Sequence, residues 1–546
     1  MIGLSDLASS HTHSWAAAQE AFDWPTVENY NIAADCLSAD PAKTALIEVN
    51  ETSRRELTFR QLNEQSAAFG AGLVGLGVQP GDRVAIKLSQ SAQMAIAVLA
   101  VLRIGGIVVP ISNVLGEDAL RHRFEDSAPR VVVSAGSPAE LVLTAEVDAI
   151  AVTTTDSPGE CTMQQLIEAA PVDSETFAPT EANTPALLLF TSGTTGNSKG
   201  VLHGHRVLLG HHAIDLALDH VRDDDVAYSP VDWAWAGGLL LGLLVPLARG
   251  LTVVAYRDTH FSAERTIDVL RTTGVSVGLF PPTALRILRR SGNLTKAVLA
   301  TLRLRSLVLG AEAVEPELTD WARDELGISV NNAYGQTEAN SLIGHATVLG
   351  PLDRDCLGRA YPGHTIAILD ADLNECNAGD TGEIAVRADD PVCMLRYWNA
   401  PEATAKKIRS GWLLTGDAAH ADAHHQIYFH GRTDDIIKSG GYRIGPAEIE
   451  AALMANPAVV ECAAIGVPDP VRGQAVAAFV KLADDVVDTD ALTKQLQELV
   501  RARVGAYAYP RIVFYVNSLP RTTAGKIDRK ALRHESAQGT QPEASR

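Results

Sequence analysis

Apolar residues follow two alternating patterns along most of the chain, one with helical spacing and one in short continuous runs. Residues 57–77 predict a helix, because apolar positions recur at helical spacing, Thr58 and Gln61 form a capping-box pattern, and Gly77 can end it. A strand is predicted at 82–88. The alternation continues with a helix at about 92–103, a strand at 107–112, a helix at about 117–124 and a strand at 130–136.

This alternation predicts an α/β fold with layers of helices around buried, largely parallel strands. Apolar runs at 251–256, 275–280 and 304–310 repeat the pattern beside helical segments, so the large N-terminal α/β lobe is predicted to extend past residue 400.

The pattern changes near residue 431, where a polar, glycine-containing stretch begins. It is followed by a predicted helix at 447–457, strands at 459–467 and 475–482, a helix at about 490–503 and a strand at 511–516. We therefore predict two domains, 1–431 and 432–546, the second a smaller α+β domain. The polar tail from about Glu535 is predicted to be disordered.

The composition narrows the classes of function. The 546 residues are 46% hydrophobic and 21% charged, as in an ordinary globular protein. The net charge of −20 disfavours nucleic acid and anionic membrane surfaces, so a small molecule is the expected partner. The six cysteines form no CxxC pair, and neither a signal peptide nor a long apolar run is evident. We expect a cytoplasmic protein with reduced thiols and no stable membrane insertion.

Candidate chemistry first occurs in the stretch FTSGTTGNSKG, residues 190–200. Glycines, hydroxyl side chains and Lys199 follow an apolar run, which suits a phosphate-binding loop. It is not a Walker-type loop, because Lys199 precedes Gly200 rather than serine or threonine. Taken alone, the stretch is either a phosphate loop or a plain turn.

Four further motifs follow in order: NNAYGQTEAN at 331–340, LLTGD at 413–417, GRTDDIIKSGGYRIGP at 431–446 and LPRTTAGKIDRKALR at 519–533. With the first, they resemble the adenylate-forming superfamily of acyl-CoA synthetases, peptide-synthetase adenylation domains and luciferases. The resemblance covers essentially the whole chain, and the overall pattern looks closest to the medium-chain acyl-CoA synthetases. It implies an AMP-forming acid–thiol ligase with ATP, Mg²⁺ and CoA as cofactor and co-substrates.

The resemblance also implies residue roles in the large domain. The phosphate loop would bind the β- and γ-phosphates through Thr191, Ser192, Gly193, Thr194, Thr195 and Gly196, with Lys199 as a catalytic cation. Further ATP-binding positions are Gly310, Ala311, Glu312, Asn332, Tyr334, Gly335, Gln336, Thr337 and Asp417, together with Arg432 at the start of the small domain. Glu338 would bind Mg²⁺. Without the resemblance, Glu338 is a solvated acid, Tyr334 a core aromatic residue, and Asp417 with Arg432 a surface ion pair.

In the small domain, the resemblance makes Lys526 the catalytic lysine that bridges the carboxylate and the α-phosphate; a mobile surface lysine is the alternative. The small domain would rotate about a hinge at Asp434. CoA would then pass along Lys438, Gly440, Gly441 and Tyr442.

The acyl pocket is assigned to Trp235, Ala236, Gly237 and Gly335. Acetate-specific relatives have bulkier residues at the last three positions, so we predict a medium-chain, branched, cyclic or aromatic acid. Tryptophans that only pack in the core are the alternative. Three other functions stay open: a stand-alone ligase that loads a carrier protein, a non-catalytic acyl-adenylate-binding module, and a luciferase-like oxygenase. A homodimer is possible.

Overall fold

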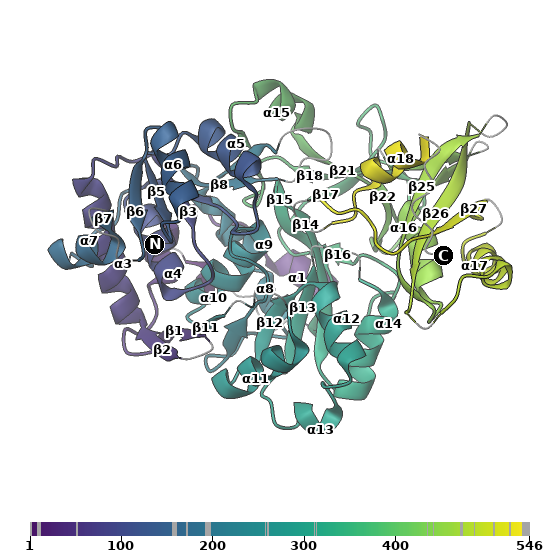
Figure 1. Ribbon diagram of the computed structural model, residues 1–546, viewed down its shortest axis with the longest axis horizontal. Helices are drawn as coiled ribbons and strands as arrows, with labels where there is room; N and C mark the ends of the chain where they lie inside the picture. Colours follow the sequence, from purple (N-terminus) through teal and green to yellow (C-terminus); the bar gives the residue numbers. More distant parts are fainter. Residues whose placement is uncertain are drawn as a thin grey trace. The chain divides into compact units, whose positions relative to one another are not determined.

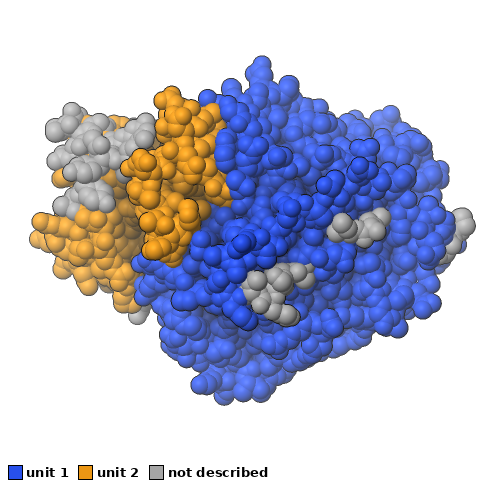
Figure 2. All heavy atoms as spheres, turned by 180° about the vertical axis from the view of Figure 1, so that it is seen from behind, with its two compact units in different colours: residues 1–191, 198–365, 386–413 blue, residues 192–197, 366–385, 414–546 orange. Residues whose placement is uncertain are grey.

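The computed structural model describes residues 3–7, 13–50, 53–155, 161–170, 173–191, 198–256, 258, 261–310, 312, 314–433, 435–439, 442–469, 473–484, 486–505, 508–522 and 526–537. The chain forms two compact units (Figure 2). Unit 1 comprises residues 1–191, 198–365 and 386–413, and unit 2 comprises 366–385 and 414–546. The predicted domain boundary after residue 431 stays a prediction, and the predicted hinge residue Asp434 lies outside the described residues.

One sheet of unit 1 has the strand order β19-β9-β8-β4-β3-β5-β6-β7 (Figure 1). Pairing is parallel from β8 through β7 and antiparallel where β9 joins β8 and β19. The strands are β3 (Arg83–Lys87), β4 (Ile107–Pro110), β5 (Val131–Ser134), β6 (Ile150–Thr153), β7 (Cys161–Thr162), β8 (Pro185–Phe190), β9 (Gly200–Gly204) and β19 (Arg396–Tyr397).

The second sheet of unit 1 has the order β16-β15-β14-β13-β12-β10-β11-β1-β2. Its strands are β1 (Thr44–Val49), β2 (Arg54–Thr58), β10 (Val226–Tyr228), β11 (Thr252–Ala255), β12 (Val277–Phe280), β13 (Ser306–Gly310), β14 (Ser329–Gln336), β15 (Ala339–Gly344) and β16 (Arg359–Ala360). Pairing is parallel from β1 through β14, whereas β14, β15 and β16 pair antiparallel. The predicted α/β layering with largely parallel strands is confirmed.

Helices of unit 1 separate the strands along the chain. They are α1 (Trp15–Ala21), α2 (Ile32–Cys36), α3 (Phe59–Gly75), α4 (Ala92–Arg103), α5 (Glu117–Ser127), α6 (Pro138–Glu146), α7 (Met163–Ala169), α8 (Ile214–Ala217), α9 (Ala236–Leu239), α10 (Val245–Ala248), α11 (Ala263–Thr273), α12 (Pro282–Ser291), α13 (Lys296–Leu299), α14 (Pro316–Trp321) and α15 (Pro401–Lys407). The predicted capping box begins α3, where the Thr58 and Gln61 side chains each accept from the other's backbone N–H.

Strand β3 is buried on both faces because helices cover each of them. Val84 and Ile86 pack in the same cluster as residues of α3 and α4. Ala85, which points to the opposite face, packs with Leu120 of α5 and Leu143 of α6. Burial of both faces explains why the strand reads as a continuous apolar run.

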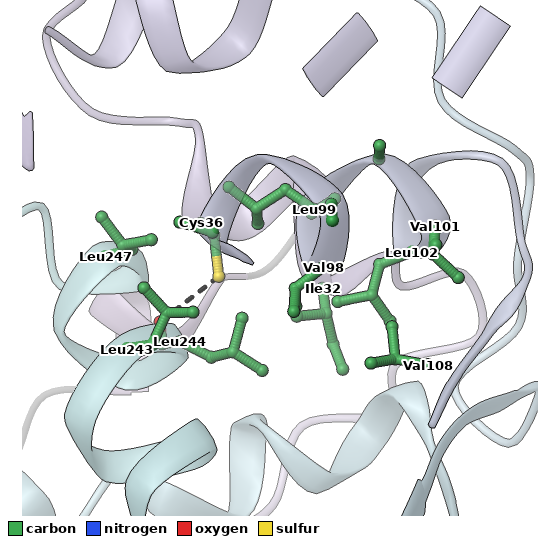
Figure 3. Packing of buried hydrophobic residues seen from close by; sticks show 14 of the residues in the cluster. Ile32, Cys36, Val98, Leu99, Val101, Leu102, Val108, Leu243, Leu244 and Leu247 are labelled. Atoms are coloured by element: carbon green, nitrogen blue, oxygen red, sulfur yellow. Dashed lines mark hydrogen bonds between the residues drawn. The ribbon is translucent and has the colours of Figure 1, made fainter. Parts of the chain in front are cut away.

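Helix α4 anchors the segment that bears the predicted acyl pocket. Figure 3 shows Leu99 of α4 near Cys36 of α2 and on the side of Leu243, Leu244 and Leu247, whereas Leu102 of α4 lies beside Val108; all belong to one buried cluster. The Cys36 thiol donates a hydrogen bond to the Leu244 carbonyl oxygen at 3.3 Å. Leu243 and Leu244 belong to a π-helical turn, Leu240–Leu244, which joins α9 to α10. The apolar packing of Leu240–Leu244 therefore fixes the position of α9, which bears the predicted pocket residues.

Two further sheets lie mostly in unit 2; residues 386–387 and 408–413 of the first belong to unit 1. One pairs β17 (Ile366–Leu369), β18 (Gly382–Arg387), β21 (Trp412–Ala421) and β22 (Ile427–Arg432) in that order, and β20 (Ile408–Arg409) forms a hairpin with the start of β21. The other has the order β24-β23-β26-β25, with β27 paired to β26. Its strands are β23 (Ile437–Ser439), β24 (Tyr442–Ile444), β25 (Val459–Asp469), β26 (Gly473–Leu482) and β27 (Ile512–Tyr515).

Helices cover both faces of this second sheet. Ala464 and Val480 pack in one cluster with residues of α16 (Pro446–Met454) and α17 (Asp490–Arg503). Ile465 and Phe479, on the opposite face, pack with Leu532 of α18 (Arg529–Ala537). The smaller α+β fold predicted for the C-terminal part is confirmed. Glu535, where the disordered tail was expected to begin, lies in α18, and residues 538–546 are outside the described part.

Two expectations from composition concern thiols and membranes. The six cysteines are free thiols, and Cys36, Cys356, Cys393 and Cys462 are buried. Within the described ranges, no helix combines the length and the apolar character needed to cross a bilayer.

Candidate active site

The phosphate loop connects β8 and β9, two antiparallel strands in which Phe190 lies opposite Gly200. The Thr191 backbone N–H donates to the Lys199 carbonyl oxygen at 3.0 Å and closes the loop at its base. His122 of α5 places Nε2 2.9 Å from the Ser198 carbonyl oxygen. The loop's predicted phosphate ligands from Ser192 to Gly196 lie outside the described residues. The structure therefore describes the two strands that flank the loop and the hydrogen bond that closes it.

Strand β9 also supports the turn that bears Thr337 and Glu338, between β14 and β15. His203 of β9 places Nε2 2.7 Å from the Thr337 carbonyl oxygen. Burial lowers the pKa of His203 to about 4, so the ring is neutral at pH 7 and its Nε2–H donates to this carbonyl. The Asn340 amide donates to the Gln336 carbonyl oxygen at 2.7 Å across the same turn. One strand thus holds both the loop base and the predicted α-phosphate contact.

Tyr397 of β19 joins Lys199 to Glu338. Its hydroxyl donates to Glu338 Oε1 at 2.6 Å, and its ring centroid lies 5.5 Å from Lys199 Nζ. The Met394 N–H donates to the Glu338 carbonyl oxygen at 2.8 Å and fixes the backbone of the acid. The predicted catalytic cation and the predicted metal ligand are therefore neighbours of the same aromatic side chain.

Glu338 suits a hard cation that is shared with substrate phosphates. The residue is half-buried, and in the part of the chain that the structure describes its carboxylate forms no ion pair. No group of three or more His, Cys, Asp or Glu side chains among the described residues could hold a metal ion. Mg²⁺ is often bound by one or two carboxylates with substrate phosphates and water. A Mg²⁺ ion at Glu338 would accordingly depend on bound nucleotide.

The predicted adenine and ribose contacts of unit 1 begin where β13 and β14 run parallel. Gly310 lies opposite Ala333, and a Cβ at Gly310 would approach the Ala333 carbonyl oxygen to 2.9 Å, so only glycine fits without movement. Tyr334 and Asn332 are half-buried on β14. The Asn332 Oδ1 atom is buried, and within the described residues it accepts no hydrogen bond. A buried acceptor without a donor is suited to a ligand amine.

Glu312 has protein partners of its own. It accepts from Thr283 Oγ1 at 2.6 Å and from Arg286 Nη2 at 2.8 Å, both on α12. Arg286 therefore offsets the negative charge that Glu312 would otherwise bring near an anionic nucleotide. Ala311 lies outside the described residues.

In unit 2, Asp417 and Arg432 lie opposite each other on β21 and β22. Arg432 Nη1 donates to Asp417 Oδ1 at 3.0 Å and to the Thr415 carbonyl oxygen at 3.0 Å. The Asp417 side chain is 6% exposed and that of Arg432 is 38% exposed. The pair is therefore mostly buried on the aspartate side, unlike a solvated surface ion pair.

Lys526 follows a short loop in unit 2 whose residues 523–525 are not described. The loop is closed by a hydrogen bond of 2.7 Å from the Thr522 N–H to the Lys526 carbonyl oxygen. Lys526 is exposed, and among the described residues its side chain forms no ion pair or hydrogen bond. Arg529, three residues on, donates to both oxygens of Glu450 at 2.7 Å and anchors the base of the segment.

The predicted CoA path falls on the hairpin of β23 and β24. Lys438 lies in β23 opposite Arg443, and Tyr442 begins β24 opposite Ser439. Gly440 and Gly441, which connect them, are outside the described residues.

The predicted acyl-pocket residues form the start of one helical segment. Trp235 precedes α9, and Ala236 and Gly237 begin it; all three are partly exposed. A Cβ at Gly237 would have one neighbour within 4 Å, Leu279 Cδ2 at 3.6 Å, so the space there is open. A Cβ at Gly335 would instead meet the backbone nitrogen of Ser341.

Three residues with contacts to the site were missed by sequence reasoning: Tyr397, His203 and Arg286. Each acts through a contact that joins distant parts of the chain. Tyr397 lies in RYWNAPEAT and His203 in VLHGH, and neither segment was assigned any chemistry. A single sequence carries no signal for such pairs; co-varying positions in an alignment would supply one.

A layered α/β unit with a glycine- and hydroxyl-rich loop, a nearby acid–lysine pair and a lysine on a separate α+β unit is the arrangement of an adenylate-forming ligase. Residues 34–398 match the family described as AMP-binding enzyme, and residues 448–526 match the AMP-binding enzyme C-terminal domain. The chain belongs to this family.

Named relatives agree with this assignment. The chain is 32% identical over 508 residues to an uncharacterized acyl–CoA ligase, YtcI, of Bacillus subtilis, which covers 92% of this chain and 94% of the relative. It is 30% identical over 501 residues to the acetyl-coenzyme A synthetase of the same organism, covering 90% and 87%. The ATP-bound MatB structure from Rhodopseudomonas palustris superposes with a TM-score of 0.84 at 26% identity, covering 94% of this chain and 100% of MatB.

These comparisons confirm the predicted superfamily and the predicted class of enzyme, an AMP-forming acid–thiol ligase. They also bear out ATP and CoA as the predicted co-substrates.

Proposed function

We propose that the protein is an ATP-dependent acyl-CoA synthetase that works in two steps. The acid first attacks the α-phosphate of ATP to form an acyl-adenylate and release pyrophosphate; the thiol of CoA then takes the acyl group and releases AMP. The observation that carries this proposal is the convergence of the loop base, the Thr337–Glu338 turn and Tyr397 on strand β9.

This arrangement suits the first step because attack of a carboxylate on a phosphate brings negative charges together. Lys199 would neutralise the leaving pyrophosphate, and Glu338 would hold Mg²⁺. Thr337 is presented by a backbone that His203 holds. The proposed ribose contact is Asp417, with Arg432 beside it, and Lys526 would activate the carboxylate from the mobile small domain.

The acid that we propose is medium-chain, branched, cyclic or aromatic. Of the two relatives compared above, one is named for acetate and the other for no particular acid, so similarity alone does not choose the acid. The open space at Gly237 supports a body larger than acetate. Gly335 does not support it, since a side chain there would collide with backbone rather than fill the pocket.

A small cavity lies beside this wall. The cavity is lined by Leu279, whose Cδ2 would lie 3.6 Å from a Cβ at Gly237. It is also lined by Leu241, Val245 and Arg249, which follow Gly237 at intervals of four residues. The lining is otherwise apolar: Ile214, Leu218, Val221, Ala227, Tyr228, Pro246, Leu251, Val277 and Gly278.

The test is to measure AMP release and CoA-thioester formation with carboxylates from acetate to decanoate and with simple aryl acids. Best turnover with acetate would refute the proposed acid. AMP without CoA thioester would favour a ligase that loads a carrier protein. A failure to form AMP with every acid, despite nucleotide binding, would favour a binding module, and light emission with a luciferin would identify an oxygenase.

Lys526→Ala separates the two steps. We expect a loss of about 10²- to 10³-fold in acyl-adenylate formation, because one transition-state contact is removed. Conversion of a supplied acyl-adenylate to thioester should persist. Lys530→Ala, an exposed lysine on α18, is the matched control and should leave both steps unchanged. Equal loss of both steps in the Lys526 variant would contradict the assigned role. Asp434 as hinge, a cytoplasmic location and a homodimer stay predictions.

A further inference from the structure

Tyr397 is a residue to which neither the sequence pattern nor the relatives' names assign a role, yet its backbone is fixed beside the phosphate loop. Tyr397 lies opposite Val201 in the antiparallel pair of β19 and β9. The Trp398 N–H donates to the Gly200 carbonyl oxygen at 2.7 Å, and the Tyr397 N–H donates to Thr404 Oγ1 at 3.0 Å. The residue is 8% exposed. Its position is therefore set by the sheet and by α15 rather than by any ligand.

The side chain makes one contact with each of two opposite charges. Its hydroxyl donates to a Glu338 carboxylate oxygen at 2.6 Å, a charge-assisted hydrogen bond that orients the acid. The Lys199 ammonium lies 5.5 Å from the ring centroid, within the range of a cation–π contact. Neither contact cancels a charge. In the described part of the chain, Lys199 and Glu338 form no ion pair with each other or with other residues.

We propose that Tyr397 is a positioning residue that holds Lys199 and Glu338 apart and keeps both charges available to the incoming nucleotide. A lysine and a glutamate at such neighbouring positions attract each other, and a direct pair would mask the cation meant for phosphate and the acid meant for Mg²⁺. The ring supplies Lys199 with a neutral partner, and the hydroxyl supplies Glu338 with a donor. This inference rests on the proposed function, because it takes Lys199 and Glu338 as phosphate and Mg²⁺ ligands.

Two substitutions separate the two contacts. Tyr397→Phe keeps the ring beneath Lys199 and removes the donor to Glu338. Tyr397→Leu removes both, which leaves Lys199 free to pair with Glu338. Tyr515→Phe is the matched control, because that hydroxyl also lies at hydrogen-bond distance, 2.9 Å, from a side-chain oxygen, Thr493 Oγ1, but is in unit 2.

The measurement is the affinity for ATP by titration calorimetry, with and without Mg²⁺, so that it does not depend on turnover. Mg²⁺ increases the affinity for ATP, and we expect this increase to be about tenfold smaller in Tyr397→Phe than in the wild type. This is the effect expected for loss of one hydrogen bond to a charged group. Its affinity for Mg²⁺-free ATP should change by less than about threefold. Tyr397→Leu should also lose about tenfold in affinity for Mg²⁺-free ATP.

A second substitution tests the masking directly. In the Tyr397→Leu background, Glu338→Gln removes the acid that captures Lys199, so affinity for Mg²⁺-free ATP should return to within about threefold of wild type. A merely structural role for Tyr397 would not produce this rescue. Thermal unfolding monitors the fold, and if the leucine variant does not fold, the Mg²⁺ dependence of Tyr397→Phe decides.

The inference is overturned if Tyr397→Phe keeps the full Mg²⁺ enhancement, or if Glu338→Gln fails to restore a folded Tyr397→Leu variant. Either result, with a wild type that still forms AMP, leaves the proposed function intact. A wild type that binds ATP equally well with and without Mg²⁺ and forms no AMP would instead refute both.

Discussion

Mild acid should destabilise unit 1, because several histidine rings are buried there in the neutral form. His203, His205 and His211 are almost fully buried. Burial disfavours the charged imidazolium and lowers the pKa of His203 and His211 to about 4 and that of His205 to about 3. The perturbation is a change of buffer from pH 7.5 to 5.5, without any change in sequence.

The sign follows from proton uptake. Each folded-state pKa lies below the unfolded value of about 6.5, so the unfolded chain binds more protons as the pH falls. The contribution of each neutral ring to the stability of the fold is fully present well above pH 6.5. It is lost as the pH falls toward the folded-state pKa values. Between pH 6.5 and 5.5, each ring lowers the free energy of unfolding by about 1 kcal/mol, and the three rings together lower it by about 3 kcal/mol. Burial raises the pKa of Asp35, which acts in the opposite direction as that carboxyl titrates.

The assay is urea unfolding followed by fluorescence at pH 7.5, 6.5 and 5.5. His205→Asn removes one titrating ring while an amide oxygen can still accept from the Ile32 N–H, which now donates to His205 Nδ1 at 3.1 Å. Its loss of stability between pH 6.5 and 5.5 should be about 1 kcal/mol smaller than that of the wild type. His424→Asn, at an exposed position, should keep the full loss. A wild type equally stable at all three pH values would refute the reasoning, as would a His205 variant with an unchanged pH dependence.

Two further predictions concern the pocket wall and the thiols. Gly237→Leu should fold normally, because the side chain fills open space beside Leu279. It should lower kcat/KM for octanoate relative to acetate by at least about tenfold. Gly238→Ala, whose Cβ would meet the Asp232 carbonyl oxygen, should instead lower the unfolding midpoint. If Gly237→Leu leaves the ranking of acids unchanged, the wall lies elsewhere. Burial raises the pKa of the Cys36 thiol well above its usual value, so Cys36 should resist alkylation at pH 8. The partly exposed Cys161 and Cys376 should react first, as measured by peptide mass spectrometry. Early labelling of Cys36 would contradict the packing.

The secondary structure of the core was well predicted because its signals are local. The helix expected at about 92–103 is α4, Ala92–Arg103, and the helix expected at about 490–503 is α17, Asp490–Arg503. A capping threonine, apolar periodicity and a terminating residue all lie within such a segment. Glu535, at about which the tail was predicted to begin, belongs to α18, where Leu532 is buried against the sheet.

For the candidate site, the sequence predicted the compact motifs but not the residues that meet only in the folded structure. The phosphate loop and the Thr337–Glu338 turn could be identified because each is a compact motif, although their roles stay predictions. Tyr397 could not, because its partners Lys199 and Glu338 are distant in the sequence and meet only through strand pairing. Gly335 shows a further limit: a small residue in a sequence does not say whether the space beside it is open or is occupied by backbone.

The π-helical turn at Leu240–Leu244 offers a route for the evolution of specificity. A π turn contains one residue more than the α-helical turn it replaces. Deletion of one residue there would rotate the start of α9, and with it Ala236 and Gly237, by about 100° relative to α10. Strands β9, β14 and β19 lie outside this segment and would keep their registers. A single in-frame deletion could thus give a descendant enzyme a different acid while it inherits the same phosphate chemistry.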